Sequence, residues 1–263
     1  MNPLTALDTR LVIAHRGNAA HAPENTLEAF DQAIALGVDA LELDVQVTRD
    51  GVPIVIHDPT LSRTAGQPHA VATLTAAELR DADAGATFTR DEGASFPYRR
   101  RGLTIPTFAE VLARYRETPL LVEVKVPAAA GAVARVLDEA GAGRRTVVAS
   151  MLDAAVVPFR GGAFATGASG NDVVRLLWHA FLPGGPTRLP YNALCIPRWY
   201  YGIPLPVVGL ARAGRRAGAA THVWTVDDPR IAKRLWAAGI QGIVTNDPAT
   251  MIKARKELQK STR

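Results

Sequence analysis

Four charged side chains alternate with apolar residues in two short segments of the sequence. Glu42 and Asp44 are two residues apart, and Glu123 and Lys125 repeat that spacing further along the chain. Successive side chains of a β-strand point to opposite faces, so each pair shares one face of its strand, and the apolar residues take the other. Carboxylates on a buried face of a strand need a positively charged partner.

Two kinds of partner fit this arrangement. Three carboxylates without a neighbouring thiol favour one hard divalent cation, Mg²⁺ or Ca²⁺, bound by Glu42, Asp44 and Glu123. Salt bridges to Lys125 and Arg16 are the alternative, and for one acidic pair alone they would be the simpler interpretation. Because two matched pairs occur in otherwise apolar strands, we predict the metal site.

Two histidines stand where apolar runs end. His15 and His57 are each followed by a polar residue and then by Gly or Pro. Catalytic groups of an α/β barrel come from the C-terminal ends of several strands, so both histidines are expected at one mouth. Histidine titrates near neutral pH, which suits proton transfer on either side of a reacting centre. We therefore predict His15 and His57 as a general acid–base pair.

Apolar, β-branched runs alternate with Ala- and Leu-rich segments of helical period along the chain. This alternation is typical of a parallel sheet wrapped by helices. Eight such runs in 263 residues predict an α/β fold with a single (β/α)8 TIM barrel over residues 1–263, since this fold typically uses about 250 residues. The predicted strands are Leu11–His15, Ala40–Val47, Leu120–Lys125, Thr146–Met151, Ala163–Ala168, Ala193–Ile196, His222–Val226 and Gly242–Thr245.

The segments between these runs carry helix signals. N-terminal capping residues precede three stretches of helical period. These stretches are Leu27–Leu36, Phe108–Tyr115 and Ile231–Ala238.

One long insertion interrupts the alternation after the second strand. Val52–His57 is a ninth apolar run, and the hairpin-like Asp50-Gly51 turn before it leads us to treat it as an extension of strand two. Residues 58–102 then form a long loop with one predicted helix near Ala76–Ala82. Long loops at strand ends are usually functional.

The composition indicates a soluble globular protein. Apolar residues make up 48% of the chain and charged residues 21%, which is enough to bury a large core. Cys195 is the only cysteine, so an internal disulfide and a thiolate zinc site are excluded and a reducing compartment is favoured. The first apolar run, Leu11–Ala14, is too short for a signal-peptide core or a membrane span. We predict a cytoplasmic protein without stable membrane insertion.

The positive net charge does not indicate a nucleic-acid partner. Residues 253–263 carry +4 of the net +5, and the rest of the chain is nearly neutral. Basic residues in a last helical turn complement the helix dipole and usually form a solvated face.

Several motifs together resemble the signature of the glycerophosphodiester phosphodiesterase family. Their order and spacing match the family's from residue 13 to about residue 248, although no single motif would be specific. The matching motifs are His15-Arg16-Gly17, Pro23-Glu24-Asn25-Thr26, Glu42-Leu43-Asp44-Val45, Thr48-Arg49-Asp50-Gly51, His57-Asp58, Arg63-Thr64, Ile105-Pro106-Thr107, Glu123-Val124-Lys125, Trp224-Thr225-Val226 and Thr245-Asn246-Asp247-Pro248.

The resemblance assigns a role to each candidate residue. It implies that His15 and His57 are the catalytic pair and that Arg16 and Lys125 bind the phosphate. Trp224 matches the aromatic wall of the family's glycerol pocket, and the three acidic residues match its metal ligands. One departure is Asn246, which stands where the family usually has Asp. Residues 161–210 match little, so the identity of the leaving group stays open.

The implied activity is metal-dependent hydrolysis of small glycerophosphodiesters to sn-glycerol 3-phosphate and an alcohol. The family's mechanism starts with attack of the neighbouring glycerol hydroxyl on phosphorus, and water then opens a cyclic phosphate. Direct attack by metal-bound water, the assignment of acid and base to the histidines, and the oligomeric state stay open. The alternatives are a lysophospholipase D or sphingomyelinase D-like enzyme, a non-catalytic phosphate-binding barrel, and a nucleic-acid phosphodiesterase, which the charge distribution disfavours.

An aromatic segment after the sixth predicted strand bears on the substrate. Trp199, Tyr200 and Tyr201 lie close together in sequence within residues 189–205. Aromatic residues usually become buried, so we expect these three to pack onto the barrel. An exposed apolar lip is the alternative, and it would favour lysophospholipid substrates.

Overall fold

The computed structural model describes residues 2–181 and 185–261, and it contains all eight predicted strands. All eight agree with the predicted ranges to within two residues at each end, although β6 is only two residues long instead of six. The parallel strands are β1 (Leu11–His15), β2 (Ala40–Val47), β4 (Leu120–Val124), β5 (Thr146–Ala149), β6 (Ala165–Thr166), β7 (Ala193–Pro197), β10 (Ala220–Trp224) and β11 (Gly242–Thr245).

These strands form a barrel that nearly closes. Their order is β6, β5, β4, β2, β1, β11, β10, β7, and all neighbours run parallel. The two ends of this path meet through a parallel bridge between Gly167 and Ala193. Glycine is needed there because a Cβ at position 167 would lie 2.9 Å from the Cβ of Ala149. The predicted (β/α)8 fold is confirmed.

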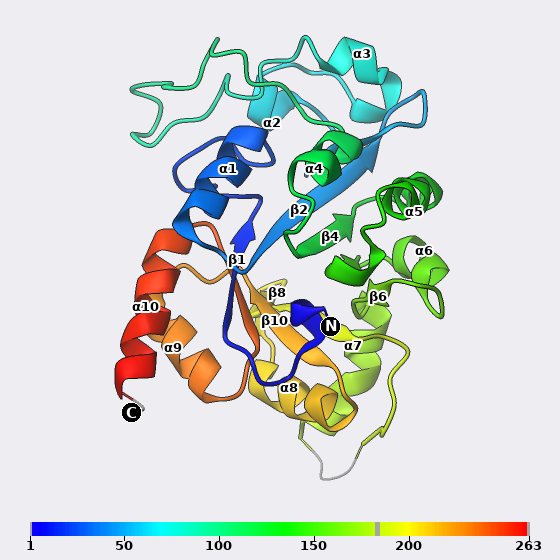
Figure 1. The fold of residues 1–263 in the computed structure, drawn as a ribbon, viewed down its shortest axis with the longest axis vertical. Helices are drawn as coiled ribbons and strands as arrows, with labels where there is room; N and C mark the ends of the chain where they lie inside the picture. The colour runs from blue at the N-terminus through cyan, green and yellow to red at the C-terminus, as the bar shows by residue number, and fades with distance from the viewer. Residues whose placement is uncertain (1, 182–184, 262–263) are drawn as a thin grey trace.

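Helices cover the outside of the barrel (Figure 1). Helix α1 begins where predicted because the Thr26 side chain accepts a hydrogen bond from the backbone N–H of Ala29, and it ends at Gly37 in the left-handed conformation. In the described part of the chain, no helix is both long enough and apolar enough to cross a membrane. The α-helices are α1 (Leu27–Leu36), α2 (Ser62–Ala65), α3 (Ala76–Leu79), α4 (Phe108–Arg114), α5 (Ala130–Glu139), α6 (Asp153–Val156), α7 (Gly170–Leu177), α8 (Val207–Arg216), α9 (Pro229–Ala237) and α10 (Pro248–Ser261). The 3₁₀ helices are η1 (Pro3–Thr5), η2 (Val71–Thr73), η3 (Pro127–Ala129), η4 (Gly143–Arg145), η5 (Val157–Phe159) and η6 (Trp178–Ala180).

Strand β2 shows how alternation divides the barrel wall. Leu41, Leu43 and Val45 are buried in the cluster that packs against the surrounding helices. Glu42 and Asp44 take the opposite face and point into the barrel, where Asp44 is completely buried. The two-residue period therefore carries both carboxylates inward, as the sequence predicts.

The hairpin-like turn predicted at Asp50-Gly51 is confirmed, but the run after it forms a separate short strand, so the prediction that it extends strand two was wrong. Gly51 adopts a left-handed conformation, and β3 (Pro53–Val55) pairs antiparallel with the end of β2. The insertion that follows is packed around its own small core, and Figure 1 shows it in cyan and teal beyond α1 and α4. The core members are Ile54, Ile56, Leu61, Ala65, Val71, Leu79, Ala82, Ala84 and Ile105.

The N-terminal segment forms the floor of the barrel. Leu4 of η1 is completely buried among the inward-facing apolar residues at the N-terminal ends of the strands. His222 of β10 lies beneath it, and its Nε2 is 2.7 Å from the carbonyl oxygen of Leu4. Residue 242 has to be glycine, since a Cβ there would lie 2.2 Å from Nδ1 of His222. The floor is therefore closed by close packing.

A second hairpin stands at the mouth after β7. Strands β8 (Trp199–Tyr200) and β9 (Ile203–Pro204) pair antiparallel. Trp199 is 55% exposed, Tyr200 44% and Tyr201 89%. The expectation that these aromatic residues pack onto the barrel was wrong, because all three are exposed.

Candidate active site

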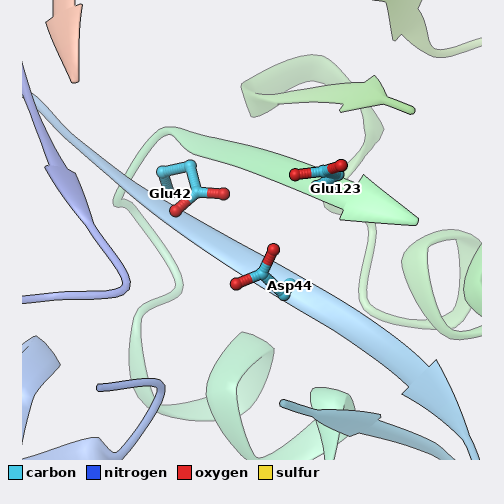
Figure 2. Close-up of side chains that lie close together, drawn as sticks. All are labelled: Glu42, Asp44 and Glu123. Carbon is cyan, nitrogen blue, oxygen red and sulfur yellow. The ribbon is translucent and has the colours of Figure 1, made fainter. Parts of the chain in front are cut away.

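Three carboxylates from β2 and β4 meet on the inner side of the barrel wall. The two strands are adjacent and parallel, and their register places Asp44 opposite Glu123. One oxygen from each of Glu42, Asp44 and Glu123 lies within 4.8 Å of the other two, and Figure 2 shows the three side chains converging. Oxygen donors at this spacing suit a hard divalent cation.

Two cations border this cluster, as the salt-bridge alternative expected. Lys125 Nζ lies 3.1 Å from Glu123 and 3.5 Å from Asp44, and Arg16 Nε lies 3.0 Å from Asp44. Arg16 also pairs with Glu24 at 2.9 Å, so its charge is shared. Asp44 Oδ1 is buried and accepts no hydrogen bond from any described residue. The protein's own cations therefore leave the three carboxylates only partly compensated, and the set fits a metal ion.

The pKa values of the cluster express the same imbalance. Burial, and then the charge of Asp44, raise the pKa of Glu42 well above its usual value and also raise that of Glu123. Burial alone would raise the pKa of Asp44 too, but the charges of Arg16 and Lys125 outweigh it and hold this pKa below its usual value. Adding a divalent cation would stabilise the ionised form of all three groups.

His15 is held from behind by a chain of polar groups. Its Nδ1 lies 2.7 Å from Oδ1 of Asn246, and the amide nitrogen of Asn246 donates to Asp227 at 2.8 Å. Because that donation turns the amide oxygen toward the imidazole, Nδ1 carries the hydrogen and Nε2 is left for the pocket. Nε2 lies 4.0 Å from Glu42. Burial and the adjacent charge of Arg16 lower the pKa of His15.

His57 is held by a carboxylate instead of an amide. Its Nδ1 lies 2.6 Å from Oδ1 of Asp58, and Arg63 donates to the same carboxylate. The hydrogen bonds from Arg63 and His57 outweigh burial and lower the pKa of Asp58 to about 2, so Asp58 is ionised near neutral pH. Arg63 also binds Glu24, which joins this group to Arg16. His57 is therefore held by an ionised carboxylate, whereas His15 is held by a neutral amide.

A pocket of about 400 Å³ brings the predicted residues together. It is lined by seven of the eight predicted site residues, and the eighth, Asp44, is buried just beneath them. The seven are His15, Arg16, Glu42, His57, Glu123, Lys125 and Trp224.

The pocket has a charged half and an apolar half. The charged half consists of the pocket residues from β1, β2, the end of β3 and β4. The apolar half is lined from β5, β6 and β7 by Ala149, Met151, Leu152, Ala168 and Cys195. Burial raises the pKa of Cys195, so its thiol is neutral and belongs to the apolar half. Such a pocket matches a ligand with one anionic and one less polar part.

Comparison with known proteins identifies the family. The profile described as the glycerophosphoryl diester phosphodiesterase family matches residues 15–250. The chain belongs to this family. A glycerophosphodiester phosphodiesterase of Caldanaerobacter subterraneus is 31% identical over 92% of this chain and 96% of its own length. A putative glycerophosphodiester phosphodiesterase of Bacillus subtilis is 32% identical over 93% of this chain and 98% of its own length.

Solved structures of the family share the fold. A putative glycerophosphoryl diester phosphodiesterase from Silicibacter pomeroyi has a TM-score of 0.75 at 27% identity, covering 95% of this chain and 94% of its own. A phosphodiesterase from Oleispira antarctica, solved with the product sn-glycerol-3-phosphate, has a TM-score of 0.74 at 24% identity, covering 97% of this chain and all of its own. The predicted family and enzyme class, a phosphodiesterase, are confirmed.

Sequence reasoning gave no role to several residues that support the family's site. Asn25 donates to Asp44 at 2.9 Å, and both Asn25 and Arg16 have positive φ, a conformation that non-glycine residues rarely adopt. Asp227 and Asn246 support His15. Glu24 and Arg63 bind each other and connect the charged residues around Arg16 to those around His57. All but Asp227 fall within the matched motifs, which was the available signal. Their contacts span loops that are distant in sequence and could not be derived from spacing.

Proposed function

We propose that this chain hydrolyses glycerophosphodiesters to sn-glycerol 3-phosphate and an alcohol with the help of one divalent cation, Mg²⁺ or Ca²⁺. The observation that carries the proposal is the convergence of three carboxylates, two histidines and two cationic side chains on one pocket. The product-bound structure of the Oleispira antarctica phosphodiesterase supports this substrate class. The cation would be held by Glu42, Asp44 and Glu123 and would polarise the phosphoryl oxygens.

The cationic side chains bind the phosphoryl group in this proposal. Arg16 and Lys125 border the carboxylates on the pocket side, where each can donate to an anionic oxygen. Both side chains stabilise the negative charge that builds up on the phosphoryl oxygens during the reaction. Trp224 lies at the boundary between the charged and apolar halves and forms a flat wall for the glycerol carbons.

The two histidines move the protons. The glycerol 2-hydroxyl oxygen attacks phosphorus and loses its proton to one imidazole, while the bond to the leaving oxygen breaks and that oxygen takes a proton from the other imidazole. Water then opens the cyclic phosphate, with the proton transfers reversed. Each transfer contributes roughly 10² to 10⁴ in rate. Both Nε2 atoms are available because both Nδ1 atoms are engaged by Asn246 and Asp58.

Direct attack by water on phosphorus is the second route to the same products. A glycerophosphocholine analogue that lacks the 2-hydroxyl distinguishes the two routes. Attack by the hydroxyl predicts no turnover of the analogue, whereas direct attack by water predicts a rate close to that of the parent substrate.

The function is tested by assaying glycerophosphocholine with and without a chelator. We expect chelation to abolish turnover and Mg²⁺ or Ca²⁺ to restore it. Glu123→Gln should lose both activity and bound metal, whereas the matched change Glu139→Gln, at an exposed position on α5, should retain both. A chelator-resistant enzyme would contradict the metal, and a chain that binds glycerol phosphate without turnover would be a phosphate-binding barrel instead.

A further inference from the structure

A groove lies next to the apolar half of the active-site pocket. Met151 and Leu152, which follow β5, line both the pocket and this second cavity of about 400 Å³. This volume lies within the range of roughly 300–1,000 Å³ that ligand sites usually occupy. Because the two cavities share these residues, they lie next to each other.

The wall of the groove is apolar along most of its length. Helix α7 contributes Val174 and Leu177, β7 contributes Ile196, and the β8–β9 hairpin and the turn after it contribute Tyr200 and Leu205. The polar lining residues Asp153 and Asn171 hydrogen-bond to each other. Little of the lining is therefore left to bind a polar ligand.

Exposed apolar side chains surround the groove. Val174 is 60% exposed and Leu152 48% exposed, and the outward-facing residues of the β8–β9 hairpin extend the apolar surface. A contiguous apolar surface on a water-soluble protein commonly marks a binding site. Here the surface adjoins a pocket whose other half is suited to a phosphodiester, so its ligand should be apolar at one end and anionic near the other.

We propose that the groove binds the acyl chain of a lysophospholipid whose glycerophosphodiester part occupies the active-site pocket. This inference rests on the proposed function and names its substrate class. Attack by the 2-hydroxyl requires that hydroxyl to be free, so the lipid carries one acyl chain instead of two. Hydrolysis of lysophosphatidylcholine then yields choline and the acylglycerol phosphate, with water supplying the oxygen and the proton.

The test compares glycerophosphocholine with hexanoyl, octanoyl and decanoyl lysophosphatidylcholine below their micelle concentrations. We expect kcat/KM to rise by up to about fourfold for each added methylene until the groove is filled, the equivalent of about 0.8 kcal/mol per methylene. If glycerophosphocholine is hydrolysed but kcat/KM does not change with acyl-chain length, this inference is overturned and the proposed function is not. Absence of turnover for every substrate would instead overturn the proposed function.

A matched pair of variants locates the effect. Val174→Asp places a carboxylate in the groove, whereas Val157→Asp makes the same change at a site that is 46% exposed and not part of the groove lining. Only Val174→Asp should flatten the chain-length series, and both should hydrolyse glycerophosphocholine within about twofold of the parent rate. Leu205→Ser provides a second groove variant in case Val174→Asp does not fold. Equal slopes in all three variants, or a gain only above the micelle concentration, would contradict binding in the groove.

Discussion

The mouth and the floor of this barrel both bury ionisable side chains, but the charge state of these side chains and the partners that compensate them differ. At the floor His222 is completely buried, its Nε2 is satisfied by the carbonyl of Leu4, and burial lowers its pKa to about 4, so the ring is neutral. At the mouth Glu42 and Asp44 are buried beside Glu123 without enough protein cations to balance them.

This difference separates stability from function. A neutral imidazole costs the floor less than a buried charge would and lets the strands pack closely, although its Nδ1 makes no hydrogen bond with any described residue. Crowded carboxylates cost folding free energy that apolar residues would not, so their presence indicates a ligand that compensates them. Changes at the mouth should therefore alter activity without lowering stability, whereas changes at the floor should lower stability without altering activity.

The strongest test of this contrast is Glu42→Gln at the mouth. We expect at least a hundredfold loss of kcat/KM, because loss of a metal ligand should exceed the roughly 10- to 100-fold cost of losing the groups that support one. The metal-free variant should melt at the same or a higher temperature, since the raised pKa of Glu42 means that its charge destabilises the fold at neutral pH.

Thermal melts with and without Mg²⁺ or Ca²⁺ provide the measurement. The parent protein should gain about 2.7 kcal/mol when the free cation is at 100 times its dissociation constant, and the variant should gain much less. A variant that melts lower than the metal-free parent would show that the carboxylate stabilises the fold by itself.

The histidines test the proposed chemistry within the mouth. His15→Ala and His57→Ala should each lower the rate on glycerophosphocholine by roughly 10² to 10⁴ without unfolding the protein. With a p-nitrophenyl ester, whose leaving group needs no proton, loss of the acid should matter far less than loss of the base. Equal losses for both variants on both substrates would refute this division of roles.

Leu4→Ala examines the floor. This change leaves a cavity beneath the barrel, and it should lower the free energy of unfolding by about 2–5 kcal/mol. Because Leu4 does not line the pocket, kcat/KM at a temperature where the variant is folded should stay within about twofold. Denaturant unfolding and the standard assay measure the two effects. If the folded variant also loses activity, the prediction that changes at the floor lower stability without altering activity is wrong.

The acid stability of the floor provides a further test. The pKa of His222 falls from 6.5 to about 4 on folding, so between these values the unfolded chain binds the proton more tightly. Stability should therefore be unaffected by this group above pH 6.5 and fall by about 3 kcal/mol as the pH drops to 4. His222→Gln, which keeps a donor for Leu4, should show a shallower decline over this window. Identical declines in both proteins would assign the acid sensitivity to other groups.

Local pattern alone was enough to predict the eight strands of the barrel and the carboxylates and histidines of its mouth. The two-residue period places Glu42 and Asp44 on one face in any β-strand, and a histidine at the end of an apolar run stands at a strand end in any parallel barrel. Eight alternating runs of suitable length also specify the fold class. These inferences depend on neighbours in sequence, where backbone geometry leaves few choices.

Tertiary structure decided what depends on distant segments. The register between β2 and β4 brings Asp44 opposite Glu123, and loop packing places Asn246 behind His15. Likewise, the exposure of Trp199 depends on which surface its hairpin meets, and the sequence expectation for it was wrong. The two-residue period of a strand determines which face each of its side chains takes. Packing between elements far apart in the chain determines which residues those side chains contact.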